Sequence, residues 1–331
     1  MRSLISFVLS CAFVLSGGAA FAAEPPPLAG RAADGVATQT SETPAMEGPL
    51  RINEDVTRPE RLSGKPPVYH PLARIAGLAG SVIVESIVEV TGQISKVKVL
   101  KGLPLGLSRA AVDSMLGWRF TPAIFEGKPV RVYYVLTVNF QLEGDPPIKS
   151  QFKRLLGDNP VLAKKLKGKS ASEVAEILAG RGEKMEPAEI PFLVFGVFLE
   201  QGRLKDSLEA ISTYRGRFQY QALYQAGAVI WSHLYQNPKA EGGGRAELIE
   251  LALGAEVGAL EVKPDGLEAL VFKALLLQEK SRITLDPLAR AALLEEVARL
   301  RDRTIQLRPE MAKDGLIPDL LDPDLSAAPG V

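Results

Sequence analysis

The residues that most often carry catalysis or bind metals are scarce in this sequence. Its 331 residues include two histidines, His70 and His233, and one cysteine, Cys11. A transition-metal site usually needs several histidine or cysteine ligands, so His70 is predicted to be a surface residue and His233 a core or groove residue. The glycines at 242–244 are followed by Arg245, without the lysine and hydroxyl residue of a phosphate-binding loop. The sequence therefore predicts no metal site, no cofactor and no enzyme activity.

Aromatic residues form the other chemically distinctive group. They recur at mostly helical intervals between positions 214 and 235 and comprise Tyr214, Phe218, Tyr220, Tyr224, Trp231 and Tyr235. One interpretation is packing between stacked helices. The other is a peptide-binding groove lined by Tyr220, Tyr224 and Tyr235, because tyrosine is a common anchor at interfaces. The sequence leaves both interpretations open.

The clearest single element is a strand over residues 130–142. Every even position there is apolar, and most odd positions are polar or amphipathic. Side chains alternate between the two faces of a strand, so the even positions are predicted to face a core. A strand this long is expected to form an exposed edge or a docking strip for a partner. The outward positions expected to contact that partner are Arg131, Tyr133, Val135, Thr137 and Asn139.

The elements before this strand predict a small α+β domain over residues 51–143. Alternating residues at 81–90 and 94–100 predict a hairpin with its turn at 91–93. Ser108 is positioned to cap a helix over 109–117, with Leu107, Ala111, Met115 and Trp118 near helical spacing. The order strand, strand, helix, strand predicts a helix packed on a three-stranded antiparallel sheet.

The N-terminus predicts export. Arg2 precedes an apolar run and the small-residue sequence at 20–22, which is typical of a signal peptide over residues 1–22. The alternative is an uncleaved inner-membrane anchor, which would be the only membrane contact. Residues 23–50 predict a flexible linker rich in proline and small residues. Lys and Arg together number 39, as do Asp and Glu, so no basic face for nucleic acid is expected.

The second half of the chain is predicted to be helical. Residues 144–150 form a proline-rich linker, and residues 151–310 predict an all-α array followed by a tail at 311–331. The segment at 202–210, together with Ala252, Ala259 and Pro264, is similar to tetratricopeptide repeats. Such helical hairpins stack into a solenoid, which predicts a second protein partner on the array.

The order of motifs between residues 58 and 142 resembles the C-terminal domain of the TonB family. The residues that carry this resemblance are Tyr69, Pro71, Ala73, Gly77, Gly80, Val82, Val84, Val88, Gly92, Val97, Val99, Leu107, Ala110, Ala111, Trp118, Phe120, Pro122, Ala123, Gly127, Lys128, Pro129, Val130 and Phe140. The resemblance implies a periplasmic, non-catalytic domain that grips outer-membrane receptors by adding a receptor segment to its sheet. It also implies that the proline-containing stretch before the first helix contacts the receptor, which adds Pro66, Pro67 and Tyr69 to the partner-binding residues.

Some features depart from the family pattern. The usual Gln-Pro before the domain is replaced by Lys65-Pro66-Pro67, the spacer at 24–48 is short, and no histidine lies within residues 1–23. The prediction is a non-enzymatic periplasmic protein that binds an extended segment of an outer-membrane receptor or another envelope protein. A role in energy-coupled transport requires the N-terminal segment to be retained as an anchor. The alternative is a structural envelope scaffold whose sheet edge is covered by its own helices or by a second copy.

Overall fold

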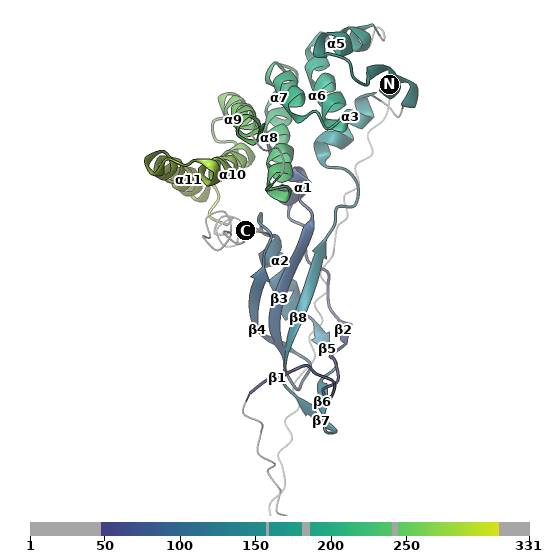
Figure 1. The fold of residues 1–331 in the computed structure, drawn as a ribbon, viewed down its shortest axis with the longest axis vertical. Helices are drawn as coiled ribbons and strands as arrows, with labels where there is room; N and C mark the ends of the chain where they lie inside the picture. Colours follow the sequence, from purple (N-terminus) through teal and green to yellow (C-terminus); the bar gives the residue numbers. More distant parts are fainter. Residues whose placement is uncertain (1–47, 157–158, 181–185, 240–243, 311–331) are drawn as a thin grey trace, which may run out of the picture. The chain divides into compact units, whose positions relative to one another are not determined.

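The computed structural model describes residues 48–310, except for 157–158, 181–185 and 240–243 (Figure 1). The predicted signal peptide, nearly all of the linker at 23–50 and the tail at 311–331 lie outside the described residues. Within the described residues, no helix is long and apolar enough to cross a membrane. A sheet-containing module comes first along the chain, and helices make up the rest.

The main sheet has four strands, in the order β1-β8-β3-β4. Strands β3 (Gly80–Val88), β4 (Ile94–Lys101) and β8 (Val132–Phe140) are the three antiparallel strands that the sequence predicted. The fourth, β1 (Leu50–Arg51), pairs with β8 in parallel. The sheet is therefore mixed, whereas the sequence analysis predicted three antiparallel strands alone.

The predicted strand at 130–142 is divided in two. A short hairpin of β6 (Ala123–Phe125) and β7 (Lys128–Val130) comes first, and β8 starts after Arg131. Within β8 the predicted alternation is confirmed, since Val132, Val138 and Phe140 are buried on the core side. The register places Val138 opposite Val82 of β3, and both side chains are buried on the same face. The continuous strand is thus shorter than predicted, because Arg131 interrupts it.

Helix α2 (Leu107–Leu116) packs against β3 and β4. The predicted buried positions are confirmed, because Leu107, Ala111 and Met115 are fully buried. The predicted cap is wrong. Gly106 occupies the N-cap position with a φ of 77°, and the hydroxyl of Ser108 instead accepts from the amide of Leu103 at 2.8 Å.

Helix α1 (Pro71–Ala76) follows the proline-rich stretch at 66–71. His70, predicted to be a surface residue, is half-buried and caps this helix by accepting a hydrogen bond from the Leu72 amide at Nδ1. Gly77 ends the helix with a φ of 66°, a conformation that glycine adopts without strain. Strands β2 (Arg61–Ser63) and β5 (Arg119–Phe120) form a separate two-stranded antiparallel sheet.

The helical region agrees with the predicted all-α, solenoid-like array. Consecutive helices pack on one another, as in the pairs α6–α7, α8–α9, α9–α10 and α10–α11, and α1 contacts α8. The first helix of this region, α3, begins at Pro147, inside the stretch that was predicted as a linker at 144–150. The elements are α3 (Pro147–Leu156), α4 (Pro160–Leu166), α5 (Ala171–Ala179), η1 (Pro187–Glu189), α6 (Ile190–Glu200), α7 (Leu204–Ser212), α8 (Gln219–Gln236), α9 (Gly244–Val262), α10 (Leu267–Ile283) and α11 (Pro287–Leu307).

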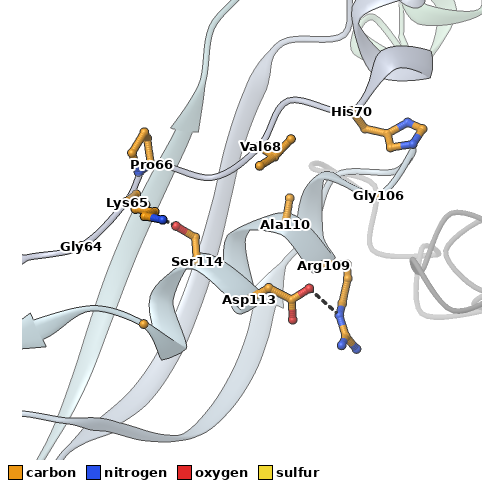
Figure 2. A pocket seen from close by; sticks show the side chains of 11 residues that line it. Gly64, Lys65, Pro66, Val68, His70, Gly106, Arg109, Ala110, Asp113 and Ser114 are labelled. Carbon is orange, nitrogen blue, oxygen red and sulfur yellow. Dashed lines mark hydrogen bonds and ion pairs between the residues drawn. The ribbon is translucent and has the colours of Figure 1, made fainter. Parts of the chain in front are cut away.

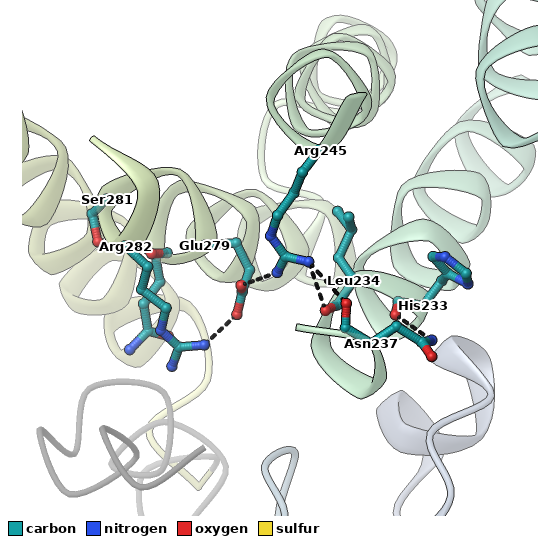
Figure 3. Close-up of polar contacts among 8 residues, drawn as sticks. His233, Leu234, Asn237, Arg245, Glu279, Ser281 and Arg282 are labelled. Atoms are coloured by element: carbon teal, nitrogen blue, oxygen red, sulfur yellow. Dashed lines mark hydrogen bonds and ion pairs between the residues drawn. The ribbon is translucent and has the colours of Figure 1, made fainter. Parts of the chain in front are cut away.

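A buried ion-pair network joins α8, α9 and α10 (Figure 3). The side chains of Arg245 and Glu279 are 9% and 5% exposed, and Nη2 of Arg245 lies 2.7 Å from Oε2 of Glu279. Arg245 also donates through Nη1 to the carbonyl oxygens of Leu234 and Asn237, at 3.1 and 3.3 Å. Arg282 donates to the second carboxylate oxygen of Glu279. Burial is tolerated here because the charges are paired and hydrogen-bonded.

Candidate protein-binding site

The outer edge of β8 is open over most of its length. β3 pairs with one side of β8 from Val132 to Phe140, whereas β1 pairs with the other side only at Val132 and Tyr133. Among the described residues, no other strand pairs with this outer side. The edge from Tyr134 to Phe140 therefore offers backbone groups to an added strand.

The position of β1 shows which backbone groups face this edge. The Leu50 amide donates to the Arg131 carbonyl at 2.8 Å, so the Arg131 carbonyl points away from β3. Backbone groups alternate in direction along a strand, so those of Val135, Thr137 and Asn139 point to the same side. Conversely, the hydroxyl of Ser86 on β3 donates to the Tyr134 carbonyl at 3.2 Å, which places the even positions on the β3 side.

The side chains at the predicted odd positions lie on the face of the sheet that is turned away from its core. Val135 is 52% exposed, and Thr137 and Asn139 are exposed as well. The hydroxyl of Ser81 donates to Oδ1 of Asn139 at 2.7 Å. Tyr133 is half-buried, with the guanidinium of Arg51 5.3 Å from its ring centre. These side chains are accessible to a strand added at the edge.

Arg131 differs from the other predicted odd positions because its guanidinium forms an ion pair with a carboxylate. Its Nε lies 2.8 Å from Oε2 of Glu89. The pKa of Glu89 is lowered, first by the hydrogen bond from the Ser95 hydroxyl and then by Arg131. The pair fixes the chain at the junction between β7 and β8, so Arg131 lies at the end of the open edge.

The predicted proline stretch is anchored on both sides. Nε1 of Trp118 donates to the Lys65 carbonyl at 2.8 Å. Tyr69 donates its hydroxyl to the Leu78 carbonyl and packs edge-on against Phe140, with ring centres 5.8 Å apart. Burial raises the pKa of Tyr69. The contact with Phe140 brings this stretch to the C-terminal end of β8, so the structure joins these two predicted groups of residues.

Pro66 is exposed and Pro67 half-buried, and Pro66 forms one wall of a groove (Figure 2). The groove lies between the extended stretch at 64–70 and helix α2, and its volume is about 920 Å³. Val68, Arg109 and Ser114 also line it. Its volume falls within the range of small-molecule and cofactor sites.

The three tyrosines predicted for a groove on the helical array all contact other residues of their own chain. Tyr224 is 6% exposed, and its ring centre lies 5.0 Å from that of half-buried Tyr220, whose hydroxyl donates to Oε2 of Glu268 at 2.8 Å. Tyr235 stacks on Trp231 at 5.4 Å, and burial raises the pKa of Tyr235 to about 12. The two ring contacts lie within α8, and the hydrogen bond to Glu268 joins α8 to α10. Partner binding at the three tyrosines stays a prediction.

Comparison with known proteins identifies the sheet module. Residues 65–142 match the family model described as Gram-negative bacterial TonB protein C-terminal. These residues form a TonB C-terminal domain. The match is confined to this domain, and the helical region that follows it lies outside the family model. The part of the chain that the structure describes contains no cluster of His, Cys, Asp and Glu able to hold a metal ion.

One solved structure similar to the TonB domain is the solution NMR structure of the Pseudomonas aeruginosa TonB CTD. The two chains are 29% identical over a match that covers 28% of this chain and 91% of that chain, with a TM-score of 0.24. No curated protein matches the chain.

Two features of the TonB domain were missed by sequence reasoning. The first is β1, whose two residues are too short for any alternation to mark them as a strand. The second is the groove against α2, which depends on Ser114 and Trp118 both donating to the Lys65 carbonyl. These contacts join residues 49 and 53 positions apart, so no local pattern announces them. The only feature of the sequence that could have indicated this groove is Lys65, which is exposed and precedes the two prolines.

Proposed function

We propose that this protein binds an extended segment of an envelope or outer-membrane partner by strand addition to the outer edge of β8. The observation that carries the proposal is the open edge from Tyr134 to Phe140, next to a place where β1 already pairs with β8. Main-chain hydrogen bonds would supply affinity, and the exposed side chains of Val135, Thr137 and Asn139 would supply specificity. The proline stretch at 66–69 would contact the same partner.

The proposed setting is the periplasm, reached through the signal peptide at residues 1–22. Retention of that segment would anchor the protein in the inner membrane and would permit a part in energy-coupled transport. The helical array would bind a second protein, with Tyr220, Tyr224 and Tyr235 as its contact residues. The packing of consecutive helices in the pairs α8–α9, α9–α10 and α10–α11 supports this second role, because stacked helices form extended binding surfaces.

Val135→Pro is expected to weaken binding of an added strand about tenfold, the effect of losing one edge hydrogen bond and its neighbouring contacts. Proline has no amide hydrogen, and the Val135 amide faces the open edge and not β3. The substitution therefore removes an edge donor and leaves the β3–β8 ladder intact. The measurement is the Kd of a peptide selected from a random displayed library on the full chain.

Val135→Ala is the matched control, since it shortens the same side chain and keeps the amide hydrogen. It should bind the selected peptide nearly as well as the parent chain. Equal affinity of the proline variant and the parent chain would rule out strand addition at this edge. Circular dichroism of both variants checks that the sheet is still folded.

A structural scaffold is the second candidate function, and β1 favours it because it shows the chain's own segment pairing with this edge. A scaffold that pairs β8 with a second copy would form a stable dimer. Sedimentation of the free chain distinguishes the two functions: a binder with an unoccupied edge sediments as a monomer, whereas an edge shared by two copies gives a dimer that Val135→Pro dissociates.

A further inference from the structure

The groove between the stretch at 64–70 and α2 combines apolar walls with unbalanced positive charge. Val68 is 78% exposed at its rim, and Pro66 and Ala110 contribute apolar surface (Figure 2). Lys65 is exposed and forms no ion pair with any described residue. Arg109 contacts Asp113 through Nε at 2.9 Å, and this exposed pair leaves the two terminal nitrogens of the guanidinium directed away. The occupant that fits this surface is extended, apolar and acidic.

The chain itself carries a segment of that chemistry at 311–331. Its four aspartates, Asp314, Asp319, Asp322 and Asp324, outnumber its one basic residue, Lys313. Apolar residues alternate with them in the sequence Leu-Ile-Pro-Asp-Leu-Leu-Asp-Pro-Asp-Leu at 316–325. The prolines disfavour a regular helix and favour an extended path, which suits a groove whose own wall is an extended proline stretch.

We propose that residues 311–331 dock in the groove formed by residues 64–70 and α2. The leucines would lie against Val68, Pro66 and Ala110, and the aspartates would meet Lys65 and Arg109. Extended at about 3.3 Å per residue, the segment reaches roughly 70 Å from Glu310. Because it is tethered, its effective concentration at the groove is on the order of millimolar, so a weak site is enough to hold it.

This docking would cover Pro66, which belongs to the stretch predicted to contact the partner. The C-terminal segment would then compete with any partner that uses this stretch. The inference stands independently of strand addition, because the groove is bounded by α2 and the open edge belongs to β8. Failure of one proposal leaves the other untouched.

The test is disulfide crosslinking in the full chain carrying Cys11→Ser, with Val68→Cys in the groove and Leu320→Cys in the segment. An intramolecular disulfide is expected to form about tenfold faster than in the control pair Val135→Cys and Leu320→Cys, because docking raises the effective concentration at the groove alone. Val135 is a fair control because it is also exposed, at 52%, and lies on the outer face of the sheet.

Charge reversal then tests the complementarity. Lys65→Glu with Arg109→Glu should lower the crosslinking rate roughly fivefold, the effect of about 1 kcal/mol. Adding Asp319→Lys and Asp322→Lys to the same chain should restore the rate, and this restoration would show that the charge-reversed chain is folded. Equal rates for the two cysteine pairs would overturn the proposal, and so would a crosslinking rate that is unchanged by the charge reversal. Crosslinks formed only between chains would also overturn it, because the occupant would then be a second copy.

Discussion

Glu279→Ala is expected to lower the free energy of unfolding of the helical region by about 3–5 kcal/mol. The substitution leaves Arg245 buried and without its carboxylate, and removal of one partner from a buried pair costs far more than the pair contributes. Arg282 loses the same partner. The side chain of Arg245 also closes the C-terminal end of α8 through two carbonyl oxygens, so its displacement would loosen the packing of three helices. Urea unfolding followed by far-ultraviolet circular dichroism measures the effect.

Two controls separate the charge from the packing. Glu279→Gln keeps the volume and one acceptor oxygen but loses the charge, so it should fall between the parent chain and Glu279→Ala. The double variant Arg245→Met with Glu279→Leu removes both charges of the closest pair and should recover most of the lost stability. Amide exchange in α8 and α10 should rise in Glu279→Ala while β3 and β8 stay protected. A loss below 1 kcal/mol would contradict burial of the pair.

The TonB domain was predictable because its signals are local. The even positions of β8 alternate with the odd ones over the whole strand, and the buried face of α2 repeats at helical spacing. Both patterns follow from the fixed geometry of one element against one core. The predicted order of strand, strand, helix and strand is confirmed for β3, β4, α2 and β8. The resemblance carried by Trp118 and Phe120 is confirmed by the family match.

What could not be predicted depends on contacts between distant residues. Arg131, which interrupts the predicted strand near its start, pairs with Glu89, 42 positions away. For the same reason, the sequence does not indicate where charged side chains are buried in the helical region. Arg245 follows three glycines and Glu279 lies in a polar stretch of α10, so each has the local sequence of a solvated residue. Only the packing of α8, α9 and α10 removes them from water.

Glu256 is a buried ionisable group whose effect on stability is expected to depend on pH. Its side chain on α9 is fully buried, and neither carboxylate oxygen has a hydrogen-bond partner among the described residues. Gly227 of α8 makes room for it, since a Cβ at that position would lie 2.2 Å from Oε1 of Glu256. Oε1 of Gln225 is also buried without a partner. A lone buried carboxylate is costly, so the neutral, protonated form is favoured in the folded state.

Glu256→Gln is therefore expected to stabilise the protein at neutral pH and to have little effect in acid. Burial raises the pKa of Glu256 well above its ordinary value of 4.5. Between pH 4.5 and the raised pKa, the folded state holds a proton that the unfolded state has released. The stability of the parent chain must then fall as pH rises through that window, by about 1.4 kcal/mol per pH unit. Glutamine does not titrate, so the difference in unfolding free energy should grow from near zero at pH 4.

Urea unfolding of both chains at pH 4, 6 and 8 measures this difference, and Gln225→Leu tests the neighbouring uncharged group under the same conditions. Gln225→Leu should shift stability by the same amount at every pH, because it removes a buried polar atom without altering a titration. A stability difference between Glu256→Gln and the parent chain that stays constant from pH 4 to 8 would mean that Glu256 is ionised or solvated in the folded state. A rising difference would mean that folding holds this carboxyl in its protonated form, which lowers the free energy of unfolding as pH increases.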